Sequence, residues 1–124
     1  MEYLFVYGSL MGGEEREGLL FHLSAVPATA PGRLWRAAAG YPAFEYDHAG
    51  AAIRGELVGV EDPQLLRVLD LVEGVSDGLY SRVQIPVAGP DGSVTAWTYV
   101  MDRHQRRRAR CTPIPGTDWR AHHR

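Results

Sequence analysis

Glu73 is the residue of this chain whose surroundings point most directly to acid–base chemistry. It lies four residues after Leu69 and seven after Leu66, so in a helix it shares the face of the apolar stripe. It also falls in the last turn, where the helix dipole disfavours a negative charge. Burial and the dipole both raise a carboxyl pKa, and such a group accepts and returns protons near neutral pH. The alternative is a solvated glutamate that simply precedes the helix-ending Gly74.

The second candidate is the loop Gly8-Ser9-Leu10, which ends an apolar strand pattern near the start of the chain. Successive backbone N–H groups in a tight loop before a helix form a concavity for an anion such as a carboxylate. The alternative is an ordinary strand-to-helix turn. The loop is not a Walker motif, because Gly-Lys-Ser/Thr is absent, and Ser9 lacks the Gly-x-Ser-x-Gly frame of a nucleophile elbow.

Three other polar residues have two interpretations each. Asp70 competes with Glu73 as a carboxylate on the same helix, but it is adjacent to the apolar stripe and turned to one side, which favours a structural role. Tyr99 alternates with Trp97 on one strand face, so its hydroxyl either reaches a cavity or packs in the core. Glu56 is either a second site carboxylate or a residue on the outside of a barrel.

The elements that must position these residues follow from periodicity and turn chemistry. Only the first strand–helix–strand stretch resembles a parallel crossover, and residues 37–50 are expected to form a loop. Strands outnumber helices, so we expect the α+β class: a small mixed β-barrel of about five strands with flanking helices. The expected strands are Glu2–Tyr7 (buried on both faces), Gly32–Trp35, Ile53–Val60, Arg82–Val87 and Val94–Met101, and the expected helices are Glu14–Leu23 and Pro63–Glu73.

Two boundaries carry strong local signals. Asp62 suits an N-cap, Pro63 suits the first helical position, and Gly74 suits the C-terminal glycine cap. The segment Gly89-Pro90-Asp91-Gly92 has the composition of a turn, which predicts a hairpin between the last two strands.

Length and composition argue against several classes of protein. The 124 residues suit a single domain over 1–124, and the net charge of −2 argues against a nucleic-acid binder. Cys111 is the only cysteine, so no intramolecular disulfide is possible and a cytoplasmic setting is expected. We expect no signal peptide, because a basic n-region and an apolar h-region are lacking. No apolar run approaches the roughly 18 residues of a membrane span.

Several conspicuous residues are assigned no chemistry. The basic run 103–110 contains no aromatic residue for base stacking and is expected to be a solvated loop or strand end. His104, His122 and His123 are not expected to bind a metal, and Cys111 is expected to be a free thiol. The three tryptophans are expected in the core or a cavity wall; they are Trp35, Trp97 and Trp119.

Several short segments together resemble the γ-glutamylcyclotransferase-like family. They are VYGSL, GRLW, GYPAF, GEL, LDLVEG, LYSRVQIPV and IPGTDW, in order from Glu2 to Trp119. This family includes γ-glutamylamine cyclotransferases, plant avirulence-induced-gene proteins and a deprotecting enzyme of aminoglycoside biosynthesis. The resemblance implies a small β-barrel with flanking helices and a cavity at one barrel end.

By motif, Tyr7, Gly8, Ser9 and Leu10 match the loop whose backbone amides bind the substrate's α-carboxylate, and Glu73 matches the catalytic glutamate. Many relatives have threonine where this chain has Ser9, and both residues supply an N–H group and a hydroxyl. The stretch MGGEEREG departs from the asparagine-containing start of the family's first helix.

The resemblance also assigns Tyr80 to the pocket wall through the matching Tyr-x-Arg segment, with Arg82 as its non-catalytic arginine. It implies an enzyme that releases 5-oxoproline from a small γ-glutamyl substrate without cofactor or metal, with no nucleic acid or membrane partner. The alternatives are a non-catalytic binding module on the same barrel and deprotection of a larger γ-glutamyl conjugate. The oligomeric state stays open.

Overall fold

The computed structural model describes residues 1–8 and 24–123, with side chains up to residue 121. The expected helix Glu14–Leu23 lies outside the described residues. The helices are α1 (Gln64–Val72), α2 (Arg103–Arg108) and α3 (Trp119–His123). The strands are β1 (Glu2–Val6), β2 (Ala25–Arg36), β3 (Pro42–Tyr46), β4 (Ala51–Val60), β5 (Ser81–Gly89), β6 (Gly92–Val100) and β7 (Thr112–Pro113).

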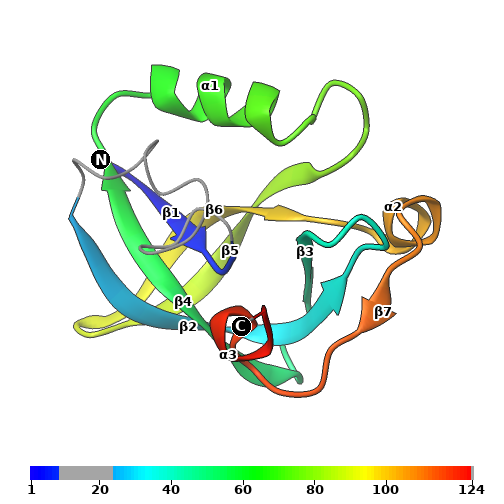
Figure 1. Cartoon of the computed structure of the whole chain (residues 1–124). Helices are drawn as coiled ribbons and strands as arrows, with labels where there is room; N and C mark the ends of the chain where they lie inside the picture. Colours follow the sequence, from blue (N-terminus) through cyan, green and yellow to red (C-terminus); the bar gives the residue numbers. More distant parts are fainter. Residues whose placement is uncertain (9–23, 124) are drawn as a thin grey trace.

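The sheet closes into a small mixed barrel, as expected. Its order is β3-β2-β4-β1-β6-β5, and the ring β2-β4-β1-β6-β5 closes where Thr29 of β2 pairs with Ala88 of β5. The pairing of β1 with β6 is parallel, and the other strand pairs are antiparallel. Figure 1 shows α1 lying across one side of this barrel.

The expected parallel crossover from the first strand to the next is wrong. One edge of β1 pairs with β4, from Glu2 opposite Val60 to Val6 opposite Glu56, and the other edge pairs with β6. Both edges of β1 are therefore occupied, and β2 pairs instead with β4. The parallel partner of β1 is a strand from the far end of the sequence, which local periodicity does not reveal.

Two strands exceed what the sequence pattern predicted. β2 begins at Ala25, although Pro27 and Pro31 interrupt its pattern, because it pairs with β4 along this whole stretch. β3 lies inside the segment expected to be a loop, and its Phe44 is fully buried. Prolines remove ladder donors without preventing pairing through neighbouring residues, which is why long-range pairing overrides the local signal here.

The hairpin is confirmed, and α1 (Gln64–Val72) begins and ends one residue inside the predicted range Pro63–Glu73. The Asp62 carboxylate accepts a hydrogen bond from the Gln64 N–H, and the backbone of Pro63 is already helical. At the other end Gly74 adopts a left-handed φ of 65°, which glycine tolerates best. The strands β5 and β6 pair from Ser81 opposite Val100 to the two-residue turn.

The basic run 103–110 is helical over α2, so the expectation of a loop or strand end is wrong. Asp102 and Gln105 form a capping box: the Asp102 carboxylate accepts from the Gln105 N–H, and the Gln105 side chain accepts from the Asp102 N–H. The buried Gln105 side chain also donates to the Gly78 carbonyl. This Asp-x-x-Gln pattern is a helix-start signal that the run of arginines obscured.

Two hydrophobic clusters share β1. Leu4 and Val6 belong to a cluster that includes Leu66 and Leu69 of α1, so this face of β1 packs against the helix. Phe5 faces the other way, into a cluster drawn from all six long strands and closed by Trp119 of α3. β1 is thus buried on both faces, as predicted, and its end is where the two clusters meet.

Candidate active site

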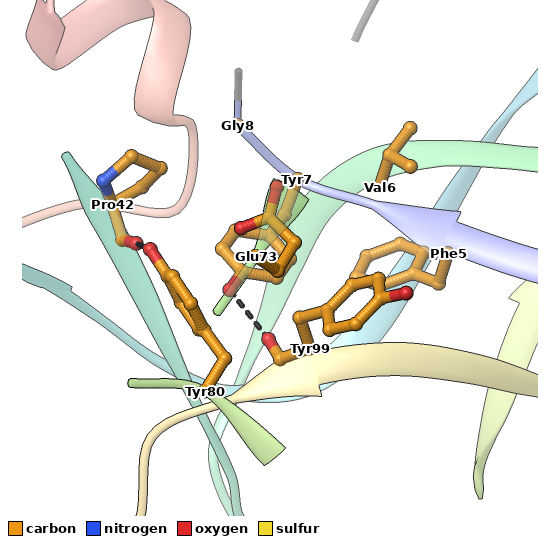
Figure 2. A pocket seen from close by; sticks show the side chains of 8 residues that line it. All are labelled: Phe5, Val6, Tyr7, Gly8, Pro42, Glu73, Tyr80 and Tyr99. Atoms are coloured by element: carbon orange, nitrogen blue, oxygen red, sulfur yellow. Dashed lines mark hydrogen bonds between the residues drawn. The ribbon is translucent and has the colours of Figure 1, made fainter. Parts of the chain in front are cut away.

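A pocket of about 310 Å³, open solvent at its mouth included, lies at the end of β1 beside the end of α1. It forms where the two hydrophobic clusters meet, and the residues drawn in Figure 2 come from β1 and the residues that follow it, the start of β3, the end of α1, the segment before β5 and β6. It is lined by Phe5, Val6, Tyr7, Gly8, Pro42, Glu73, Tyr80 and Tyr99.

Glu73 places a carboxyl group in this pocket from the C-cap position of α1. Its side chain is only 6% exposed, and among the described residues it is the only buried carboxylate. The interpretation of a solvated helix-end glutamate is therefore wrong. Because Leu66 and Leu69 bury the same helix face, the apolar stripe itself carries Glu73 inward.

The backbone around Glu73 is closed by a Schellman motif. The Gly74 N–H donates to the Leu71 carbonyl at 3.2 Å, and the Val75 N–H donates to the Asp70 carbonyl at 3.0 Å. These bonds satisfy carbonyls that a helix end otherwise leaves without partners. The orientation of Glu73 is thus set by the turn that follows it as well as by the helix.

Gly8 approaches Pro42 too closely for any side chain. A Cβ added at Gly8 would lie 2.3 Å from the Pro42 Cγ. Glycine therefore lets the chain leave β1 against the start of β3, beside the pocket. Ser9 and Leu10 lie outside the described residues, so the anion-binding loop stays a prediction.

Tyr7 ties the end of β1 to β6. Its buried hydroxyl donates to the Tyr99 carbonyl at 2.5 Å, a bond drawn in Figure 2. Burial, reinforced by the neighbouring Tyr80 and Glu73, raises the pKa of Tyr7 well above its usual value. The Tyr7 hydroxyl therefore stays protonated and acts as a fixed donor inside the protein.

Tyr80 and Tyr99 both line the pocket, but their hydroxyls are directed differently. The Tyr80 hydroxyl donates to the Pro42 carbonyl across the pocket wall. The Tyr99 ring points away from Glu73, and its hydroxyl donates to Asp70 at 2.8 Å. The structure thus directs the Tyr99 hydroxyl towards Asp70 and not towards Glu73, and contact of Tyr99 with substrate stays a prediction.

Asp70 is fully engaged by neighbouring strands, in agreement with a structural role. Arg82 donates to its two oxygens at 2.7 and 3.1 Å. The Arg82 guanidinium also lies over the Trp97 ring, 4.4 Å from its centroid. Burial and the hydrogen bond to Asp70 raise the pKa of Tyr99.

The remaining candidates lie away from the pocket lining. Glu56 pairs with Arg120 at 3.3 Å, and Arg106 of the basic run pairs with Glu45 at 3.6 Å. Cys111 is a free thiol, as expected, and burial raises its pKa. Pro42 was missed by sequence reasoning because it was placed in a loop, although the segment GYPAF was a usable signal.

The described part of the chain lacks two further features. Over residues 1–8 and 24–123, no three His, Cys, Asp or Glu side chains gather as metal ligands would. No helix formed by these residues is both long and apolar enough to cross a membrane.

The fold is a small mixed barrel, and its pocket holds the buried carboxyl group of Glu73. Residues 4–121 match the family model described as gamma-glutamyl cyclotransferase, AIG2-like. The chain therefore belongs to the gamma-glutamyl cyclotransferase, AIG2-like family. No significant match is found among curated proteins.

Solved structures agree with this assignment. YkqA from Bacillus subtilis is 27% identical with a TM-score of 0.76, and the match covers 98% of this chain but only 40% of YkqA. An AIG2-like protein from Mus musculus is 26% identical with a TM-score of 0.68, over 82% of this chain and 77% of its own. A gamma-glutamyl cyclotransferase is 19% identical with a TM-score of 0.62, over 92% of this chain and 72% of its own. At this identity the match shows the fold alone.

Proposed function

We propose that this protein is a γ-glutamyl cyclotransferase whose acid–base group is Glu73. The observation that carries the proposal is a buried carboxyl group in a pocket beside Gly8, in a chain of this family. A carboxyl group held away from water at a pocket wall is suited to proton transfer.

The reaction is intramolecular. Glu73 accepts a proton from the substrate's α-ammonium group, and the freed amine nitrogen attacks the γ-carbonyl carbon. A carbon–nitrogen bond forms within the substrate, and the bond from the γ-carbon to the leaving nitrogen breaks. Glu73 returns its proton to that nitrogen as the bond breaks, and the second proton that the ring nitrogen loses is also taken up by the released amine. The products are therefore 5-oxoproline and a protonated amine, with no water consumed.

No cofactor or metal enters this scheme because the nucleophile is already tethered to its target. Holding both groups in contact supplies part of the acceleration. The proposed role of the loop at Gly8, Ser9 and Leu10 is to hold the α-carboxylate with backbone N–H groups, so that the substrate folds back on itself. Tyr7 and Tyr80 would shape the wall against which it folds.

The proposed partner is a small γ-glutamyl compound, and no nucleic-acid partner is proposed. Arg106 of the basic helix is already engaged by Glu45 and the Met101 carbonyl. An oligonucleotide that bound with a salt-dependent affinity would contradict this part of the proposal.

The test is release of 5-oxoproline from γ-glutamyl amines, γ-glutamyl dipeptides, glutathione and a larger γ-glutamyl conjugate. Loss of a general acid–base group costs about 10²–10⁴-fold in rate, so Glu73→Gln should fall by that amount. Glu61→Gln is the matched control, because Glu61 is an exposed glutamate just before α1.

The outcomes separate the alternatives. Turnover of the conjugate alone would favour a deprotecting enzyme. Binding of these compounds without any release would favour a non-catalytic module on the same barrel. Full turnover by a folded Glu73→Gln protein would remove Glu73 from the mechanism.

A further inference from the structure

Glu73 occupies a position that a helix by itself holds poorly. It is the C-cap residue of α1, with φ −86° and ψ 2°, and its N–H donates to the Leu69 carbonyl at 2.8 Å. Helix ends fray because their last carbonyls have no partner within the helix. A group that must face a pocket from such a position needs support from outside the helix.

Asp70 supplies that support from one turn before Glu73. Its carbonyl accepts the Val75 N–H, which closes the chain immediately after Glu73. Its side chain accepts from Arg82 of β5 and from Tyr99 of β6. One residue thus connects the last turn of α1 to two barrel strands and to the turn that follows.

Asp70 is itself held in one orientation. The two-pronged contact between Arg82 and Asp70 fixes direction as well as distance, because the guanidinium is planar. Arg82 also lies over Trp97, and the Trp97 indole N–H donates to Glu2 of β1 at 2.9 Å. The contacts that hold Asp70 therefore extend across three neighbouring strands, β5, β6 and β1.

Tyr99 connects Asp70 to the opposite wall of the pocket. Its hydroxyl holds Asp70 on the α1 side, and its carbonyl accepts the Tyr7 hydroxyl on the β1 side. Tyr7 immediately precedes Gly8 and lines the same pocket as Glu73. A shift of Tyr99 would therefore change the spacing between Glu73 and the substrate-binding side.

We infer that Asp70 is the positioning residue for Glu73: held by Arg82 and Tyr99, it keeps the Glu73 carboxyl group facing the pocket. This inference rests on the proposed acid–base role of Glu73. Asp70 does not line the pocket and acts only through Glu73. Pairing with Arg82 also offsets the negative charge of Asp70, which lies one turn from Glu73.

The test uses Asp70→Asn, Asp70→Ala and Tyr99→Phe in the full chain. A displacement of about 1 Å costs up to about 10²-fold in rate, so kcat should fall at least about tenfold. KM should change less than about threefold, because the α-carboxylate is assigned to the loop at Gly8. Asp70→Asn should retain more activity than Asp70→Ala, because it keeps an oxygen for the Tyr99 hydroxyl.

Glu45→Gln is the matched control. It removes a different carboxylate–arginine pair, Glu45 with Arg106, between β3 and α2 and outside the pocket lining. It should leave kcat within about twofold of the native value. Activity is counted per folded molecule, so that a loss of stability alone does not lower it.

A second readout does not need turnover. The carboxyl carbon of Glu73 is observed by NMR in protein labelled with ¹³C-glutamate and is identified by its loss in Glu73→Gln. Its resonance should move in Tyr99→Phe and Asp70→Asn and stay in place in Glu45→Gln. Tyr99→Phe removes a single oxygen and keeps the carbonyl bond to Tyr7, so it is the variant best suited to remain folded.

Different experimental results would overturn the cyclotransferase proposal and the positioning role of Asp70. No 5-oxoproline release from the native chain would overturn the cyclotransferase proposal, and the NMR readout would still decide the position of Glu73. Native turnover with an unmoved resonance and an unchanged kcat in Tyr99→Phe and Asp70→Asn would overturn the positioning role alone.

Discussion

Gly8 and Pro42 meet so closely that no side chain fits between them. The Pro42 Cγ lies where it would be 2.3 Å from a Cβ on residue 8. Proline is a rigid ring at the start of β3, so the clash cannot be relieved by rotating a flexible side chain. The glycine of the VYGSL segment is therefore required by packing, whatever the loop after it binds.

Replacing Gly8 by alanine should lower the free energy of unfolding by about 1–3 kcal/mol, the usual cost of overpacking. Urea unfolding measures this change. Gly59→Ala is the control, because its new Cβ would meet only the flexible end of the exposed Met1 side chain. Equal stability of the Gly8→Ala and native proteins would contradict the close packing of Gly8 against Pro42.

Replacing Gly74 by alanine should destabilise the end of α1. Gly74 has a left-handed φ of 65°, which costs a residue with a Cβ roughly 1–2 kcal/mol. Gly74→Asn should lose less, because asparagine tolerates this conformation better. Thermal unfolding of the two variants measures the difference, and an equal loss in both would argue against strain as the cause.

Stability should decline above about pH 10 because of Tyr7 and Tyr99. Both have pKa values raised in the folded state, with burial as the largest cause. Above the unfolded pKa of about 10, the unfolded chain loses these protons while the folded chain keeps them. The unfolded state then binds fewer protons, so the free energy of unfolding falls as pH rises.

Urea unfolding between pH 8 and pH 11.5 measures this decline. Tyr7→Phe and Tyr99→Phe should each make the decline shallower, because each removes one of the groups that titrate. Gly74→Asn is the control, since it lowers stability without removing a titrating group. An equally steep decline in all three variants would assign the alkaline loss to other groups.

Removing the side-chain cap of α2 should loosen the first turn of this helix. Asp102→Ala should cost about 1 kcal/mol, as N-cap truncations do. Asp102→Asn keeps an acceptor for the Gln105 N–H and should cost less. Hydrogen exchange at residues 105–108 reports the local effect, and unchanged protection in Asp102→Ala would contradict it.

Part of the site was predictable because its signals are local. The helix start at Asp62 and Pro63 and its end at Gly74 depend on neighbouring residues alone. The inward direction of Glu73 follows from the same helical repeat that buries Leu66 and Leu69. A glutamate on the buried stripe can be recognised from spacing before any partner is known.

Other features depended on contacts between distant segments. β3 and Pro42 are hidden in a stretch whose proline and glycines indicate a loop, and only pairing with β2 makes it a strand. Tyr99 carries the right residue type for the pocket, but its hydroxyl is directed at Asp70, 29 residues away in sequence. The helix α2 was not predicted because its run of arginines was interpreted as a solvated loop or strand end, although its capping pattern is local.

The sequence by itself determined the class of barrel, the ends of α1 to within one residue, the hairpin and the place of Glu73 on the apolar stripe, because each depends on periodicity or on turn chemistry over a few residues. The structure then decided that Glu73 is buried and not solvated. Only the tertiary structure decided that β1 runs parallel to β6 and that Gly8 packs on Pro42. It also decided that Tyr99 connects Asp70 to Tyr7. The hydrogen bond from Tyr7 to Tyr99 joins residues 92 positions apart, and over such separations the free energy of packing and hydrogen bonding selects partners that no local pattern encodes.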